Sequence, residues 1–163
     1  GKEQEDCRIN DVVERALVVF RPQIKRVATV RSDWGDVPTV RCFPTEIAQV
    51  VLNILVNAAQ AIEETGTPGA EVIHIRTYET DHAVCCSISN TGTSIPREVR
   101  QRIFEPFVST KPSELGTGLG LSLSKQIIET RHGGRLLLSS SKEPTFVIEL
   151  PKSSEHGTAP PGE

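Results

Sequence analysis

A short polar segment that ends in three alternating glycines places the strongest constraint on the fold of this chain. Residues 109–121 read S-T-K-P-S-E-L-G-T-G-L-G-L, with glycines at 116, 118 and 120, and the apolar positions of a helix follow directly. Glycine lets backbone N–H groups approach an anion closely, and the start of a helix adds the positive end of its dipole. The segment therefore predicts a phosphate-binding loop at the beginning of a helix.

A long helical pattern from Pro44 to about Glu64 is the second informative feature. Its apolar residues form one broad face suited to lying on a sheet: Ile47, Val50, Val51, Ile54, Leu55, Ala58, Ala61 and Ile62. Polar residues recur three or four positions apart and therefore align in a narrow stripe: Glu46, Gln49, Asn53, Asn57 and Gln60. The helix is predicted to pack in the core and to present a row of amides on its other side.

The two asparagines of this stripe need an explanation, because asparagine is a poor helix former. An amide oxygen is a neutral, hard ligand that suits Mg²⁺, which binds few protein groups together with water and phosphate oxygens. A solvent-facing stripe without a ligand is an equally good interpretation of the helix alone. The glycine segment favours the first interpretation, and together the two features predict a site for ATP and Mg²⁺.

Hydrophobic periodicity also places the other elements. Strands are predicted at 26–32, 39–42, 71–79, 83–89, 135–139 and 145–150, and helices from Asn10 to a stop or bend at Pro22, after Pro96, and from Leu119 to about His132. Several strands are joined as hairpins, which excludes a purely parallel sheet. We therefore expect an α+β fold, a two-layer α/β sandwich with a mixed, mostly antiparallel sheet of about five strands and three main helices on one face.

Length and composition limit the organisation and the partners of the chain. Its 163 residues, 37% of them hydrophobic, suffice for one domain, which we expect at 8–151 between a frayed linker at 1–7 and a disordered tail at 152–163. A net charge of -3 disfavours nucleic acid, and no apolar run predicts a membrane contact. Because the sequence contains no methionine, we expect it to be part of a longer protein. The cysteines at 7, 42, 85 and 86 lack the spacing of a zinc site and are expected to be reduced, structural thiols.

In their order along the chain, these motifs resemble the catalytic, ATP-binding domain of bacterial sensor histidine kinases, in the GHKL superfamily shared with gyrase, the ninety-kilodalton heat-shock chaperone and the MutL repair ATPase. The resemblance covers roughly residues 8 to 151 and implies the Bergerat fold. The stretch Q-V-V-L-N-I-L-V-N-A-A-Q-A-I is similar to the N box, which places the Mg²⁺-binding asparagine at Asn57 and a further nucleotide contact at Asn53. The stretch G-T-G-L-G-L-S-L-S-K resembles the second glycine box, which implies triphosphate contacts at Gly116, Thr117, Gly118, Leu119, Gly120 and Leu121.

The chain departs from this family at the first glycine box, D-x-G-x-G-I, where it has S-N-T-G-T-S-I-P. Asn90 takes the position of the aspartate that accepts a hydrogen bond from the adenine amino group. Gly92 is kept, Ser94 replaces the second glycine, and Ile95 completes the box. Asparagine still offers an acceptor oxygen but lacks the charge that makes such a bond about twice as strong, so we expect adenine binding to persist but weaken. Thr145, in the remnant of a later G-T-T-F pattern, is expected beside the base.

The segment before the glycines is expected to act as a lid. The stretch I-F-E-P-F is similar to the F box, and Phe104 and Phe107 would anchor it, whereas residues 109–115 have little apolar content and should be mobile. Thr110 and Lys111 are expected to contact the nucleotide, with Lys111 on the phosphates as a catalytic residue. A glycine-rich loop that only caps a helix is the alternative, but it leaves the neighbouring motifs unexplained.

The resemblance implies a kinase rather than a hydrolase. ATP-hydrolysing relatives carry a water-activating glutamate one turn before the metal-binding asparagine, and this position holds Asn53, which cannot act as a general base. We expect Asn57 to bind Mg²⁺ and the γ-phosphate to pass to a histidine on a separate dimerisation domain of the parent protein, and then to the receiver domain of a response regulator. The histidines at 74, 82, 132 and 156 are not expected to be that acceptor, so the fragment should phosphorylate nothing in cis.

Two other functions stay open. A degenerate regulatory module with weakened adenine recognition is favoured by the altered first glycine box. A protein serine kinase of the anti-sigma type belongs to the same superfamily, although the long N box and F-E-P-F favour the histidine kinase. The domain is expected in the cytoplasm, whether or not its parent is anchored in a membrane.

Overall fold

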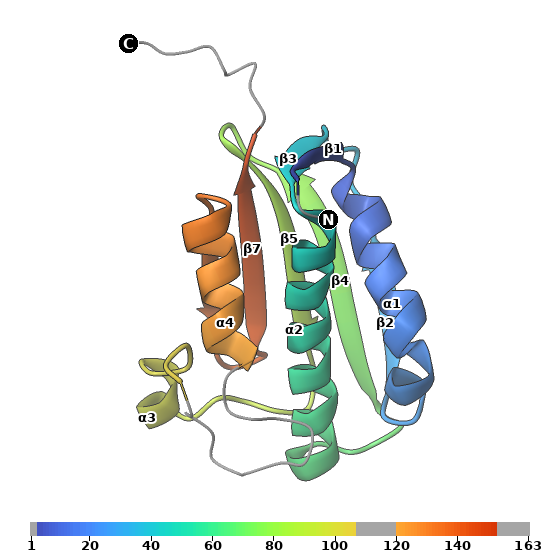
Figure 1. Cartoon of the computed structure of the whole chain (residues 1–163). Coiled ribbons are helices and arrows are strands. Elements are labelled where there is room, and N and C mark those ends of the chain that lie inside the picture. Colours follow the sequence, from blue (N-terminus) through green and yellow to red (C-terminus); the bar gives the residue numbers. More distant parts are fainter. Residues whose placement is uncertain (1–2, 107–119, 153–163) are drawn as a thin grey trace.

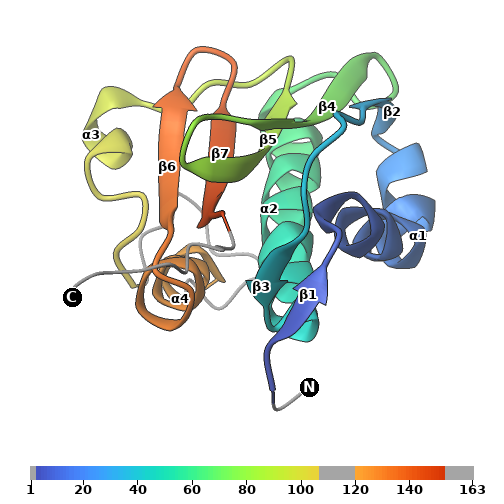
Figure 2. The same ribbon diagram turned by 90° about the horizontal axis from the view of Figure 1, so that it is seen from above.

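Three helices lie side by side on one face of a mixed sheet. The computed structural model describes residues 3–106 and 120–152, and within them the main sheet has five strands in the order β2-β4-β5-β7-β6. The helices that cover it are α1 (Ile9–Lys25), α2 (Pro44–Thr65) and α4 (Gly120–Gln126) (Figures 1 and 2). This arrangement confirms the predicted two-layer sandwich.

The strands of the main sheet are β2 (Ala28–Asp33), β4 (Glu71–Glu79), β5 (Ala83–Asn90), β6 (Arg135–Ser140) and β7 (Thr145–Pro151). The pair β2–β4 is parallel, and the pairs β4–β5, β5–β7 and β6–β7 are antiparallel. The sheet is therefore mixed and mostly antiparallel, as predicted. Strand β5 lies at its centre and ends at Asn90, which brings that residue under the helical layer.

Helix α2 forms because its apolar residues recur on one side and Pro44 occupies its first turn, where a missing N–H costs nothing. Its buried residues are Ile47, Val50, Val51, Ile54, Leu55, Ala58, Ala59 and Ile62. Among the described residues, α2 is also the one helix with the length and hydropathy to cross a membrane. Its place in the core of the domain accounts for both properties.

Helix α1 corrects the predicted stop at Pro22, one of the two outcomes expected there, because it continues to Lys25. Proline removes one helical hydrogen bond, which disfavours this position. Ile24, beyond the proline, is fully buried, and Phe20 before it is 9% exposed. Burial of these large side chains in the core outweighs the local preference of the proline.

The N-terminal residues correct a second prediction. Residues 1–7 were expected to fray, but Glu5–Cys7 forms strand β1 and pairs antiparallel with β3 (Val40–Cys42). The physical reason is that Cys7 is buried in the hydrophobic core. The strands predicted at 26–32 and 39–42 correspond to β2 and β3, which belong to different sheets.

All four cysteines are free and buried, which confirms the prediction of structural thiols. Burial raises the pKa of the Cys42 thiol, and it raises the pKa of Cys86 to about 12. These groups therefore stay protonated at neutral pH. A thiol of this kind is a weak nucleophile.

The described residues reach slightly into the expected C-terminal tail. Lys152 donates its backbone N–H to the carbonyl of His82 at 3.0 Å, and its Nζ lies 2.8 Å from a carboxylate oxygen of Glu79. Lys152 is therefore part of the folded body. Residues 153–163, the rest of the expected tail, lie outside the described residues.

Candidate functional site

The amide stripe of α2 faces the beginning of α4, which follows the glycine segment. The Nδ2 atom of Asn53 lies 3.3 Å from the Gly120 carbonyl oxygen and 3.1 Å from Oγ of Ser124, which is fully buried. The Oδ1 atom of Asn53 accepts a hydrogen bond of 3.0 Å from Gln49. The two motifs that predicted the site are thus in direct contact.

Asn57 lies one helical turn further along α2 and is placed differently. Its side chain is exposed, and within the described ranges it forms no hydrogen bond. It borders a cavity that also reaches Asn90 at the end of β5. Asn57 therefore offers an uncommitted amide oxygen between the start of α4 and this cavity.

The cavity lies between α2, β5, β7 and the segment that follows β5. Its volume is about 40 Å³, and its lining residues are Ile54, Asn57, Ala58, Ala61, Ile88, Asn90, Thr93, Ser94, Ile95, Pro144 and Phe146. Most of these side chains are apolar, which suits the faces of an aromatic ring. A polar group stands at its floor, because Asn90 is buried at 4% exposure.

The carboxamide of Asn90 is held by its own turn. Nδ2 donates to the Thr91 carbonyl at 2.9 Å and to Oγ1 of Thr93 at 2.8 Å. Oδ1 has no hydrogen-bond partner among the described residues. The backbone N–H of Asn90 donates to the Pro144 carbonyl at 3.2 Å, which fixes β5 to the start of β7.

Gly92 is required in this turn for two reasons. Its backbone φ is +83°, a value that residues other than glycine rarely adopt, and a Cβ at this position would meet the Glu71 carboxylate. That carboxylate accepts hydrogen bonds from Oγ1 of Thr91 at 2.8 Å and from the backbone N–H of Thr67 at 2.9 Å. Sequence reasoning missed Glu71, which lies about 20 positions before the motif and has no local signal.

The remaining residues that were predicted near the base differ in whether they line the cavity. Ser94 and Ile95 line the cavity, and the Ile95 backbone N–H donates to the Ser141 carbonyl at 3.0 Å. Thr145 does not line it, because its Oγ1 bonds to the Glu143 carbonyl at 2.8 Å. Its neighbours Pro144 and Phe146 line the cavity instead.

The second glycine box is only partly within the described ranges. Gly120 opens α4, and Leu121 packs against the hydrophobic core. Thr110, Lys111, Gly116, Thr117, Gly118 and Leu119 lie outside the described residues, as do Phe107 and the expected lid. Phe104, its other predicted anchor, contacts Phe146 edge to face with ring centroids 5.9 Å apart.

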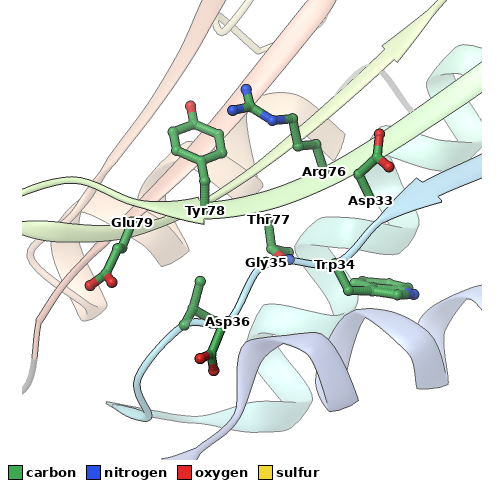
Figure 3. A pocket seen from close by; sticks show the side chains of 9 residues that line it. Asp33, Trp34, Gly35, Asp36, Arg76, Thr77, Tyr78 and Glu79 are labelled. Carbon is green, nitrogen blue, oxygen red and sulfur yellow. The ribbon is translucent and has the colours of Figure 1, made fainter.

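A second, open cavity of about 420 Å³ lies at the outer edge of the sheet (Figure 3). Arg76 and Tyr78 project from one side of β4, with the guanidinium 4.5 Å from the ring centroid. Thr77 points the other way, where its Oγ1 accepts from the Gly35 N–H and donates to Asn10. These contacts tie α1 to the edge of the sheet.

Comparisons with known proteins agree with this geometry. Residues 43–154 match the family described as Histidine kinase-, DNA gyrase B-, and HSP90-like ATPase. The chain is 33% identical over 153 residues to the sensory histidine kinase/phosphatase NtrB of Proteus hauseri, and 40% identical over 147 residues to the signal transduction histidine-protein kinase AtoS of Escherichia coli K12. Both matches cover 88% of this chain, which spans 42% of the length of NtrB and 23% of AtoS.

Solved structures extend the likeness to the whole fold. The catalytic domain of the histidine kinase ThkA superposes with a TM-score of 0.79 at 31% identity, over 94% of this chain and 98% of that one. ThkA in complex with the response regulator protein TrrA superposes with a TM-score of 0.75 at 29% identity, over 94% of this chain and 43% of that one. The chain belongs to the family of histidine kinase-, DNA gyrase B- and HSP90-like ATPases and is homologous to the catalytic domains of sensor histidine kinases.

Proposed function

We propose that the chain binds ATP with Mg²⁺ and transfers the γ-phosphoryl group to a histidine on a separate dimerisation domain of its parent protein. The observation that carries this proposal is the contact of Asn53 with Gly120 and Ser124, which joins the amide helix to the end of the glycine segment. The nearby cavity with Asn90 at its floor supplies a place for the base. One nucleotide then spans both motifs.

Each proposed contact follows from the chemistry of its residue. Asn90 accepts a hydrogen bond from the adenine amino group, and the backbone of residues 116–121 binds the triphosphate. Thr110 is a further proposed nucleotide contact. Lys111 is proposed to bind the phosphates and, with Asn57, to form the catalytic pair.

The residues of this chain fit a magnesium ion. The carboxamide of Asn57 is exposed and uncommitted beside the cavity, and an amide oxygen is a ligand that Mg²⁺ accepts. A bound magnesium ion would neutralise charge on the phosphates. Asn57 would hold it, while Asn53 keeps the adjoining helices together.

Asn53 also favours transfer over hydrolysis. Its carboxamide is hydrogen-bonded to Gln49, Gly120 and Ser124, and an amide cannot take a proton from water at neutral pH. Transfer to a histidine does not need a residue of this chain to activate water. The acceptor supplies its own nucleophile, and positioning carries most of the catalysis.

Binding of a base requires the cavity to widen. A volume of about 40 Å³ holds one or two water molecules. Its walls on α2, β5 and β7 belong to the core, whereas Ser94 is exposed and the backbone of Ile95 is fixed by one hydrogen bond to Ser141. We propose that Ser94 and Ile95 move outward when the nucleotide enters.

Membership of the same family also supports a proposal for the partners and the location of the parent protein. We propose that the phosphohistidine passes its phosphoryl group to the receiver domain of a response regulator, a partner class that ThkA binds in its complex with TrrA. The domain would act in the cytoplasm, where ATP is available.

A degenerate regulatory module is the second candidate, and Asn90 in place of aspartate is the observation that favours it. An experiment with labelled phosphate distinguishes the kinase from the regulatory module. The chain is mixed with the dimerisation domain of its parent and γ-labelled ATP, and acid-labile label on the histidine is followed over time. The kinase predicts Mg²⁺-dependent label on that domain. Binding of ATP without any label would support the regulatory module, and no binding even at millimolar ATP would contradict both nucleotide-binding functions.

A further inference from the structure

The carboxylate of Glu71 joins two segments that are distant in the sequence. Glu71 begins β4 and is half-buried. One carboxylate oxygen accepts the backbone N–H of Thr67, in the connection between α2 and β4, at 2.9 Å. The other accepts the hydroxyl of Thr91, just after β5, at 2.8 Å. Within the described residues Glu71 forms no ion pair, so its charge serves these two hydrogen bonds.

The direction of the hydrogen bond between Thr91 and Glu71 follows from the other partner of the hydroxyl. The backbone N–H of Val72 lies 2.9 Å from Oγ1 of Thr91, and a backbone N–H can only donate. The hydroxyl proton of Thr91 is therefore free to point to Glu71, and a carboxylate can only accept it. The backbone N–H of Thr91 donates to the Val72 carbonyl at 3.0 Å. Both the backbone and the side chain of Thr91 are thus held by the start of β4.

The residues that Glu71 contacts lie between residues that line the base cavity. The carboxylate fills the space where a Cβ of residue 92 would stand, so it packs against the backbone of Gly92. Asn90 and Thr93 line the cavity, and Thr91 and Gly92 connect them. The Asn90 carboxamide donates to the Thr91 carbonyl at 2.9 Å, so a displacement of Thr91 would move the polar group of the cavity as well. Glu71 does not line the cavity and acts on it through these contacts.

We propose that Glu71 is a positioning residue that holds residues 90–93 in the conformation that receives the base before a nucleotide binds. This inference rests on the proposed function, in which the cavity takes the base. A site that is already ordered binds more tightly, because the cost of ordering it is not subtracted from the free energy of binding. The sign of the effect separates positioning from charge. A negative charge beside a nucleotide site repels the triphosphate, so its loss alone should strengthen ATP binding, whereas loss of positioning should weaken it.

Dissociation constants for ATP with Mg²⁺, measured by competition against a fluorescent ATP analogue, test the inference. Glu71→Ala removes both hydrogen bonds and should weaken ATP binding about three- to tenfold, the value of one hydrogen bond. Glu71→Gln should restore most of the affinity, because its amide can accept from Thr67 and donate to the second lone pair of the Thr91 hydroxyl. Glu79→Ala is the matched control. It removes the same charge and an ion pair with Lys152 at the other end of β4, and should leave ATP binding unchanged.

Circular dichroism shows which variants are folded. A folded Glu71→Ala variant that binds ATP as tightly as the unmodified chain, or more tightly, would overturn the inference. Equal weakening in Glu71→Ala and Glu71→Gln would overturn it too, because the hydrogen bonds would then not be the cause.

Thr91→Val tests the same hydrogen bond from its other end and decides the matter if Glu71→Ala does not fold. It deletes the hydroxyl, keeps the shape of the side chain, and leaves the backbone bond to Val72 in place. ATP binding should weaken by a similar factor, and unchanged binding would overturn the inference. Failure of the unmodified chain to bind ATP would instead overturn the proposed function.

Discussion

Asn53 and Asn57 stand one helical turn apart on α2, yet their carboxamides have different surroundings. Asn53 is bonded to the first turn of α4, whereas Asn57 is exposed and has no hydrogen bond within the described ranges. A side chain without a structural partner is available for a ligand. We therefore propose a stabilising role for Asn53 and metal binding for Asn57, and each proposal can be tested by itself.

Asn57→Ala should remove Mg²⁺-dependent ATP binding with little effect on folding. Loss of even an outer partner of a metal ligand lowers metal affinity about 10- to 100-fold, so loss of the ligand should cost at least as much. Titration with a fluorescent ATP analogue, with and without Mg²⁺, measures the effect. Gln60→Ala, one turn further on the same stripe, is the control. Equal Mg²⁺ dependence in both variants would contradict the assignment of Asn57.

Gly92→Ala should destabilise the fold more than Gly69→Ala. Both glycines have positive φ, +83° and +90°, so both variants should lose about 1–2 kcal/mol from backbone strain. Only at Gly92 would the new Cβ displace the Glu71 carboxylate, whereas nothing lies within 4 Å at Gly69. The bonds of Glu71 to Thr91 and Thr67 should then weaken, which adds about 1–2 kcal/mol. Urea unfolding measures both variants, and equal losses would show that Glu71 does not hold this turn.

At the scale of elements, the join between α2 and α4 decides the geometry of the site. Asn53→Ala should lower the free energy of unfolding by about 1–2 kcal/mol, because the fully buried Ser124 loses a hydrogen-bond partner. The better helix propensity of alanine offsets a few tenths of a kcal/mol of this loss. Gln49→Ala removes only the exposed bond to Asn53 and should change stability by less than about 0.5 kcal/mol. Similar losses in the two variants would contradict a joining role for Asn53.

An ion pair joins α2 to the helical segment that continues α4. α4 continues as a π-helical segment, Ile127–Arg131, and Arg131 binds Glu46 of α2 through two hydrogen bonds of 2.7 and 3.1 Å. The Arg131 guanidinium holds the pKa of the Glu46 carboxyl below its usual range. Because the folded pKa is the lower one, this pair stabilises the fold fully above the ordinary glutamate pKa of about 4.3, and the contribution is lost as the pH falls through the lowered value.

Glu46→Gln should therefore flatten the acid side of the stability curve. Unfolding by urea is measured at a series of pH values from neutral down through the glutamate range. Arg131→Gln removes the same charge pair and should flatten the same part of the curve. Curves for both variants that run parallel to that of the unmodified chain would contradict this account of the pair.

Sequence reasoning predicted the long periodic elements and missed the short or distant contacts. The predicted strand at 71–79 coincides with β4, and the predicted helix from Pro44 to about Glu64 ends at Thr65, because many residues repeat one pattern. The pairing of Glu5–Cys7 with β3 gave no signal, since three residues show no period. Asn90 and Gly92 were predicted through the motif, but Glu71 and Thr93 act through contacts that only the fold creates.

At the scale of the whole molecule, the site lies where the helical layer meets the end of the central strand. Asn53 reaches a residue 67 positions later in the chain, and the cavity joins α2 to residues 88–95 and to the start of β7. One rigid sheet holds these parts in fixed relation (Figure 1). One bound nucleotide should therefore change the surroundings of all these parts over the same range of nucleotide concentration.

Nuclear magnetic resonance of the isotope-labelled chain, titrated with a non-hydrolysable ATP analogue and Mg²⁺, tests this claim most directly. The side-chain amides of Asn57 and Asn90 and the backbone amides of Gly120 and Leu121 should all shift with the same dissociation constant. The backbone amide signal of Gly35, which lies at the cavity shown in Figure 3, should not shift. Shifts at only one of the two motifs, or two different constants, would contradict a single nucleotide site built from both.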